Sequence, residues 1–259
     1  MDFDITRHGN GEPVVFVHGG GAADEFLPLL HEPALERFRL ISYRRRGYGY
    51  AGYTGPVSVE QHAADCAAVL TKAGVDRAHV VGKSFGALVA LQLAADEPNL
   101  VHSLTLLEPT LAAVPSGPQL LRGLAPVAQL YRDGDPGGAV HAYLTAVWGV
   151  DWRAEFHRAV PGGPKQAERD AAGLFESDLP QLASWALPAE LSQPVLHVLG
   201  TQSSPVFAEG RDLLAARLPQ LEVAVLPGLN HLLQLRDPAR VAAVVAGFLH
   251  HHPMEVAAR

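Results

Sequence analysis

Short, nearly uninterrupted apolar runs recur along the chain, and most are followed by a segment of helical length. Such runs are typical of strands buried on both faces, and their alternation with helices indicates a parallel sheet covered on both sides. The predicted strands are residues 14–17, 39–43, 79–81, 101–107, 194–200 and 221–226, and the predicted helices are 24–37, 58–72, 85–95, 206–217 and 238–249. We therefore predict an α/β fold with a mostly parallel sheet.

The first residues follow a different pattern, in which Phe3 and Ile5 alternate with polar neighbours. Gly9-Asn10-Gly11 comes next, and an Asn-Gly pair favours a tight hairpin turn. We expect the chain to open as a hairpin-like edge of the sheet.

Residues 112–190 interrupt the alternation of strands and helices. Prolines break this segment into short helical pieces, no strand pattern appears in it, and it holds all three tryptophans. We predict a helical lid inserted into a core made of residues 1–111 and 191–259. Most of its aromatic side chains would fix the lid to the core, whereas one or two, with Trp148 and Trp152 as candidates, would line an apolar substrate pocket.

Composition narrows the class of protein. The chain has 259 residues, a net charge of −7 and one cysteine, Cys66. The negative charge argues against nucleic acid or an anionic membrane as partner, and a single cysteine forms no internal disulfide. The N-terminal segment is acidic, and no apolar run is long enough to span a bilayer. We expect a cytoplasmic protein, a monomer or homodimer, that acts on a small molecule.

The strongest chemical signal is Gly82-Lys83-Ser84-Phe85-Gly86, which joins a predicted strand to a predicted helix. A turn this tight holds the Ser84 hydroxyl clear of the backbone, and side chains at Gly82 and Gly86 would clash as strand and helix fold back on each other. The helix directs free N–H groups toward the same point. Ser84 is the candidate nucleophile, although a serine in a glycine-rich turn is more often an ordinary turn residue.

Other motifs in the chain predict less. Gly82-Lys83-Ser84 resembles the end of a phosphate-binding loop, but that loop requires a glycine where Arg77 stands. Arg44-Arg45-Arg46 could bind an anion, although a loop with internal ion pairs is the simpler expectation. The three histidines 250–252 are too short a run for a metal site. We expect neither metal nor cofactor.

A serine hydroxyl becomes a nucleophile when a neighbouring base takes its proton. His231 has the right position, because it follows the last predicted strand and precedes the last helix. The oxyanion that forms on attack needs N–H donors already in place. Phe85 supplies one, and Gly20, in the loop after the strand 14–17, is the second candidate. Its neighbours Gly19 and Gly21 are expected to line the substrate pocket.

Three segments carry a resemblance to a known family: His18-Gly19-Gly20-Gly21, Gly82-Lys83-Ser84-Phe85-Gly86 and Gly228-Leu229-Asn230-His231. In this order, and over nearly the whole chain, the sequence resembles the α/β-hydrolase fold family. The resemblance is weakest in the predicted lid. It implies an eight-stranded, mostly parallel sheet and a triad of serine, histidine and an acid.

The chain departs from the family pattern at the acid. Most relatives carry it shortly after the strand that ends at Gly200, where this chain has no carboxylate in residues 201–205. Some branches, haloalkane dehalogenases among them, place it after the strand that follows the nucleophile helix. Glu108 stands there and is the expected acid, with Glu209 or a dyad without an acid as alternatives. Arg44 stands where relatives often carry aspartate, and we assign it no function.

These residues predict hydrolysis of an ester, thioester or lactone with an apolar part, and C–C bond hydrolysis is a close neighbour of that chemistry. Dehalogenase and epoxide-hydrolase chemistry are disfavoured, because those relatives use an aspartate where Ser84 stands. A cofactor-free oxygenase or lyase would use the pair of His231 and its acid as base without acylating Ser84. A third alternative is a small-ligand receptor that has lost turnover.

Overall fold

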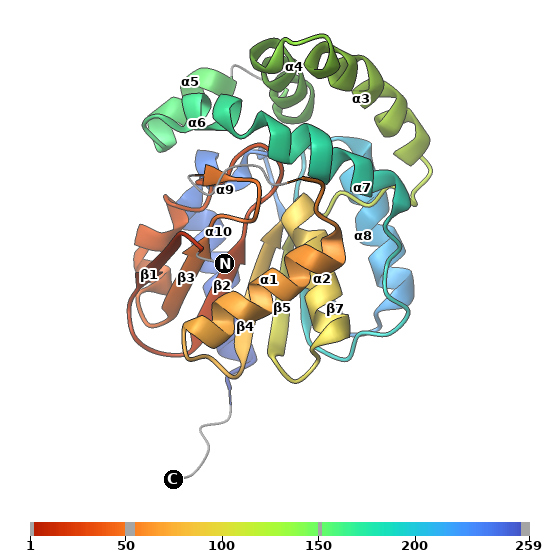
Figure 1. Cartoon of the computed structure of the whole chain (residues 1–259). Helices are drawn as coiled ribbons and strands as arrows, with labels where there is room; N and C mark the ends of the chain where they lie inside the picture. The colour runs from red at the N-terminus through yellow and green to blue at the C-terminus, as the bar shows by residue number, and fades with distance from the viewer. Residues whose placement is uncertain (1–2, 50–54, 150–151, 255–259) are drawn as a thin grey trace.

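A seven-stranded sheet forms the centre of the computed structural model (Figure 1), in the order β1-β3-β2-β4-β5-β6-β7. The structure describes residues 3–49, 55–149 and 152–254. Neighbouring strands are parallel except for β1 and β3. The described residues thus contain seven strands rather than the eight that the family resemblance implies. Their bounds are β1 (Ile5–His8), β2 (Pro13–Val17), β3 (Arg39–Tyr43), β4 (Ala78–Lys83), β5 (Val101–Leu107), β6 (Val195–Gly200) and β7 (Leu221–Leu226).

The first strand lies at the edge of the sheet as expected, but the predicted hairpin is wrong. β1 pairs antiparallel with β3, and β2 pairs with the other side of β3. The glycines of the connecting loop allow it to cross the start of β3 at close range. A Cβ atom on Gly9 would lie 2.3 Å from the carbonyl oxygen of Phe38, and one on Gly11 would lie 2.1 Å from that of Arg37.

Helices cover both faces of the sheet, as the alternating pattern predicts. α1 (Val59–Lys72) and α2 (Phe85–Asp96) lie in front of the sheet in Figure 1, and α10 (Pro238–His251) lies behind it. Alternate side chains of each strand therefore enter different apolar clusters: Val15 packs with the α1 and α2 side, and Phe16 with the α10 side. The remaining helices of the core are α8 (Pro205–Arg217) and the short α9 (Leu233–Arg236).

The segment 24–37, predicted as one helix, forms only two 3-10 turns, η1 (Leu29–His31) and η2 (Pro33–Leu35). Pro28 and Pro33 lie inside the predicted helix, and each lacks the N–H that a continuing helix would need. The apolar side chains that suggested a helix are still buried, since Leu29 and Leu35 belong to the core. The pattern therefore predicted burial correctly and the type of structure incorrectly.

Between β5 and β6 the described chain forms helices and no strand. Figure 1 shows these helices above one end of the sheet, the end where β4 and β5 lead into their loops. We call them the cap helices; the division into a core and a separate lid domain stays a prediction. They are α3 (Gly117–Arg132), α4 (Pro136–Trp148), α5 (Trp152–Ala159), α6 (Gly163–Arg169), the π-helical segment Gly173–Asp178 and α7 (Leu179–Ser184).

The predicted boundaries of α1 are confirmed by its contacts. The hydroxyl of Ser58 accepts a hydrogen bond from the N–H of Gln61, and Gly74 follows the helix with a φ of +67°. Both are standard ways to satisfy groups left over at helix ends. In the described part of the chain, no helix is long and apolar enough to cross a membrane.

Candidate active site

Ser84 lies at the junction of β4 and α2 with a backbone that L-residues rarely adopt. Its φ is +52° and its ψ is −118°. Among the described residues, only one other non-glycine residue has a positive φ, and that residue is Glu108, at +48°. Strained backbone of this kind tends to persist at functional sites, where the surrounding structure enforces it. The predicted nucleophile and the predicted acid therefore share an uncommon property.

The glycines beside Ser84 are required by close packing, as the sequence predicts. A Cβ atom on Gly82 would lie 2.5 Å from the carbonyl oxygen of Gly86. One on Gly86 would lie 2.1 Å from the carbonyl oxygen of Val17. Helix α2 can therefore pack this closely on β4, at Gly82, and on β2, at Gly86, only without these side chains.

Glu108 and His231 come together as predicted. Nδ1 of His231 lies 2.6 Å from Oε2 of Glu108, and both side chains are buried. An ionised carboxylate only accepts hydrogen bonds, so Nδ1 carries the proton and Nε2 is left as the basic nitrogen. Nε2 has no hydrogen-bond partner in the described structure. The ring of Phe207 stacks on the imidazole at a centroid distance of 4.2 Å and fixes its plane.

The loop after β6 contributes donors to the acid instead of supplying one. Oε1 of Glu108 accepts from the N–H of Gly200 at 2.8 Å and from the hydroxyl of Ser203 at 2.5 Å. Although burial opposes ionisation, His231 and these donors together lower the pKa of Glu108. The alternative acid, Glu209, accepts instead from Ser116 on the cap side.

Ser84 does not form a hydrogen bond with His231 in this structure. Its Oγ lies 3.0 Å from Oγ1 of Thr110, a residue that the sequence analysis did not single out. In this structure the histidine and the acid are therefore hydrogen-bonded to each other, whereas the serine is hydrogen-bonded to the hydroxyl of Thr110.

The N–H groups of Gly19, Gly20 and Gly21 differ in their partners. The N–H of Gly19 donates to Oε1 of Glu25 at 2.6 Å, and the N–H of Gly21 donates to the hydroxyl of Tyr48 at 3.2 Å. The N–H groups of Gly20 and Phe85 have no partner among the described residues. Gly20 is partly exposed and Phe85 is buried, and free N–H groups of this kind are what an oxyanion hole requires.

Comparisons with known proteins identify the family to which the fold belongs. Residues 12–238 match the family described as the alpha/beta hydrolase fold. The chain belongs to the α/β-hydrolase fold family.

Several relatives of this α/β hydrolase match along almost their full length. The pimeloyl-[acyl-carrier protein] methyl ester esterase of Methylococcus capsulatus is 31% identical over 263 residues, which cover 96% of this chain and 99% of that protein. The 2-(acetamidomethylene)succinate hydrolase of Mesorhizobium japonicum is 26% identical and covers 96% and 92%. An alpha/beta hydrolase of Sphaerobacter thermophilus has a similar crystal structure, with a TM-score of 0.76, 28% identity and coverage of 95% and 96%. The chain is thus a hydrolytic enzyme of this fold.

A buried ion pair lies next to the histidine of this α/β hydrolase. Nζ of Lys83, the residue before Ser84, lies 3.0 Å from Oε2 of Glu25. Gln234 donates to the same carboxylate oxygen at 2.7 Å. Burial lowers the pKa of His231, and the positive charge of Lys83 lowers it further, against the opposite effect of Glu108. The imidazole is therefore neutral, as a base must be, to a lower pH than usual.

The two tryptophans predicted for the pocket differ in their contacts. The carbonyl oxygen of Trp148 accepts from the side chain of Asn230, next to His231, and Nζ of Lys83 lies 5.8 Å from the Trp148 ring. The ring N–H of Trp152 donates to His141, and its ring contacts Trp148 within the cap helices. Trp148 is thus beside the candidate site, and a pocket role for both residues stays a prediction.

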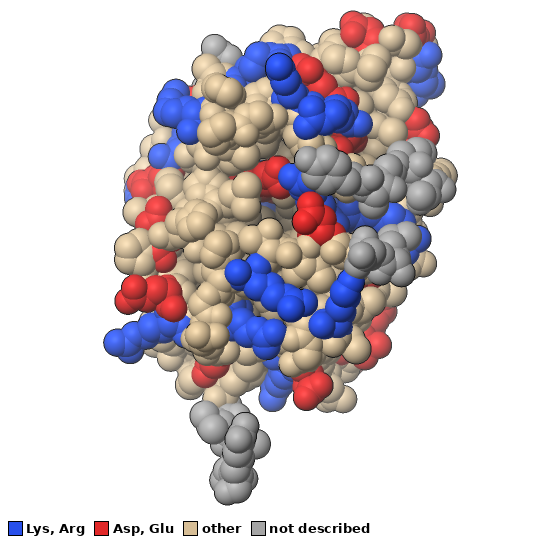
Figure 2. All heavy atoms as spheres, turned by 60° about the vertical axis from the view of Figure 1, so that its left-hand side comes forward, with Lys and Arg blue, Asp and Glu red and all other residues tan. Residues whose placement is uncertain are grey.

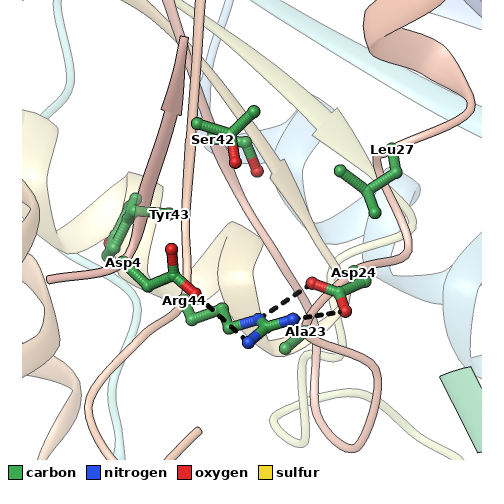
Figure 3. Close-up of a pocket in the computed structure, with 8 residues that line it drawn as sticks. Asp4, Ala23, Asp24, Leu27, Ser42, Tyr43 and Arg44 are labelled. Atoms are coloured by element: carbon green, nitrogen blue, oxygen red, sulfur yellow. Dashed lines mark hydrogen bonds and ion pairs between the residues drawn. The ribbon is translucent and has the colours of Figure 1, made fainter. Parts of the chain in front are cut away.

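Each arginine of the loop 44–46 forms an ion pair with an aspartate. The sequence allows either anion binding or internal ion pairs for this loop, and internal ion pairs are what the structure contains. Arg44 lies between Asp4 and Asp24 at a pocket of about 100 Å³ (Figure 3). The other two pairs are Arg45 with Asp178 and Arg46 with Asp65.

Proposed function

We propose that this α/β hydrolase is a serine hydrolase that cleaves an ester, thioester or lactone of a small, partly apolar substrate. The observation that carries the proposal is the buried hydrogen bond between His231 and Glu108, which leaves Nε2 of His231 as an unpartnered base. Without that bond the imidazole would lack both its tautomer and its orientation.

The proposed reaction assigns one step to each group. The hydroxyl of Ser84 breaks its hydrogen bond with Thr110 and gives its proton to Nε2 of His231. Its Oγ attacks the carbonyl carbon of the substrate. The oxyanion accepts hydrogen bonds from the N–H groups of Gly20 and Phe85. His231 returns the proton to the leaving alcohol or thiol, and water then releases the acyl group from Ser84 by the same steps.

The cap helices favour an apolar acyl or alcohol part. Side chains of Leu174, Leu144 and Tyr143 lie 3.3 to 3.7 Å from where a Cβ of Gly21 would be. The substrate would meet these side chains beside the oxyanion loop. A relative named as a methyl ester esterase supports the ester class. Acidic and basic side chains are interspersed on the face shown in Figure 2, which favours a small molecule over nucleic acid.

The test is hydrolysis of p-nitrophenyl acetate, butyrate and octanoate by the purified protein and by Ser84→Ala. We expect kcat/KM of the variant to fall by about 10⁴-fold or more. Ser184→Ala, at an exposed serine at the end of α7, is the control and should match the wild type. Retention of a tenth of the activity in Ser84→Ala would contradict the proposal.

One observation favours a second candidate, a cofactor-free oxygenase or lyase. Ser84 is bonded to Thr110 while Nε2 of His231 has no partner, so a hydroxylated or aromatic substrate could give its proton directly to His231. This enzyme would keep turnover in Ser84→Ala and lose it in His231→Ala. The two variants therefore separate the candidates.

A further inference from the structure

The oxyanion loop is held by hydrogen bonds from Arg45, a buried residue in the loop after β3. The guanidinium of Arg45 donates to the carbonyl oxygens of His18 and Gly19, both at 3.1 Å. The backbone N–H of Arg45 donates to Nε2 of His18 at 3.0 Å. Arg45 therefore fixes the first half of the loop through two carbonyl oxygens and the ring of His18.

Arg45 is itself held by a carboxylate of the cap helices. Asp178, the last residue of the π-helical segment, accepts from Nη1 at 3.0 Å and from Nη2 at 2.6 Å. The two side chains are 0% and 1% exposed. Buried charges that are paired in this two-pronged geometry have few alternative arrangements, because either charge alone would be strongly unfavourable there.

Tyr48 extends the same link to the second half of the loop. Its hydroxyl donates to Oδ2 of Asp178 at 2.5 Å and accepts from the N–H of Gly21 at 3.2 Å. Oδ2 of Asp178 also lies 3.3 Å from where a Cβ of Gly20 would be. The negative charge of this buried carboxylate is balanced by Arg45.

We propose that Asp178 is a positioning residue for the oxyanion hole, acting through Arg45 and Tyr48. The inference rests on the proposed function, in which the N–H of Gly20 binds the oxyanion. Neighbouring groups of the loop are fixed by these three side chains and by Glu25, so the N–H of Gly20 is held ready. The hole is complete only while the π-helical segment is docked, which makes the cap helices part of transition-state stabilisation.

The first test is Tyr48→Phe, which removes one hydroxyl and keeps the ion pair. We expect kcat for p-nitrophenyl butyrate to fall about tenfold or more, with KM within threefold, because a displaced oxyanion donor costs transition-state binding. Tyr43→Phe is the matched control, since Tyr43 is equally buried but packs on β3 against Phe3. Asp178→Asn should lower kcat further, and both variants are assayed below their melting temperatures.

Hydrogen–deuterium exchange of a peptide covering residues 18–22 separates the positioning role from the function. We expect faster exchange in Tyr48→Phe than in the wild type and in Tyr43→Phe, whether or not the protein turns over esters. An unchanged exchange rate, or an unchanged kcat in a folded Tyr48→Phe, would overturn the inference. Absence of esterase activity in the wild type would overturn the proposed function. The exchange measurement would still test whether the link from Asp178 through Tyr48 holds the loop.

Discussion

The three donors around Glu108 decide what its substitution should do. In Glu108→Gln, Gly200 and Ser203 would keep the amide oxygen at the Oε1 position, so the amide NH₂ would face Nδ1 of His231. Nδ1 would then have to accept, and Nε2 would carry the proton and could not act as base. We predict a loss of kcat of up to about 10⁴-fold with the fold intact.

Steady-state kinetics and circular dichroism of Glu108→Gln check this prediction. Glu209→Gln is the matched control, because Glu209 bonds to Ser116 and not to His231. Near-normal turnover in Glu108→Gln would remove Glu108 from the site. A large loss in Glu209→Gln would transfer the role to that residue.

The two charges of the Lys83–Glu25 ion pair should change the pKa of His231 in opposite directions. Protonation of His231 ends its action as base, so kcat/KM falls as the pH falls through its pKa, which burial and Lys83 hold below the usual value. Lys83→Met removes a charge that lowers this pKa, and Glu25→Gln removes one that raises it. We predict that the acid limb of the pH profile of kcat/KM moves to higher pH in Lys83→Met and to lower pH in Glu25→Gln. Shifts in the same direction would contradict this electrostatic account.

At the scale of elements, the contact of α2 with β2 leaves no room at Gly86. An added Cβ would lie 2.1 Å from the carbonyl oxygen of Val17, a backbone atom that cannot rotate away. We predict that Gly86→Ala lowers the free energy of unfolding by about 3 kcal/mol or more, measured in urea. Gly123→Ala, in α3 with nothing within 4 Å, should raise it by up to about 1 kcal/mol. Equal stability of the two variants would show that the turn can adapt.

Elements were predictable from the sequence where burial and local chemistry agree. β3 and β5 have the predicted bounds, because most of their side chains are apolar and nearly all of them are buried in the sheet. The segment 24–37 has the apolar spacing of a helix, but its prolines prevent one. The pairing of β1 with β3 could not be predicted from the loop 9–11. Glycines are expected there both in a tight hairpin turn and in a loop that passes close to another strand.

The candidate site was predictable to the extent that motifs mark it. Ser84, His231 and Glu108 each follow a strand, and the carboxyl ends of parallel strands meet at one edge. Thr110, Tyr48 and Asp178 have no motif. Asp178 comes to Arg45 across 133 positions, through the packing of a helical segment that local pattern does not determine.

For the whole molecule, buried neutral histidines predict a loss of stability in acid. Both ring nitrogens of His197, on β6, are buried without partners among the described residues, and burial lowers its pKa to about 4. In the unfolded chain His197 takes up a proton near pH 6.5, whereas in the folded protein it takes one up only near pH 4. Stability is therefore present above pH 6.5 and is lost as the pH falls toward 4.

We predict that His197 alone costs about 2 kcal/mol of stability between pH 7 and pH 5. Urea unfolding at both pH values checks this, and His197→Leu should lose correspondingly less on acidification than the wild type. Equal losses in the two proteins would assign the acid sensitivity to other groups.

The most direct measurement of the central claim is covalent labelling with a fluorophosphonate at neutral pH, followed by mass spectrometry of the peptides. Phosphonylation requires a serine that a neighbouring base activates. We predict one added group per chain, on Ser84, and none in His231→Ala. A folded wild-type protein that stays unlabelled, or that carries the group elsewhere, would contradict a nucleophile at Ser84.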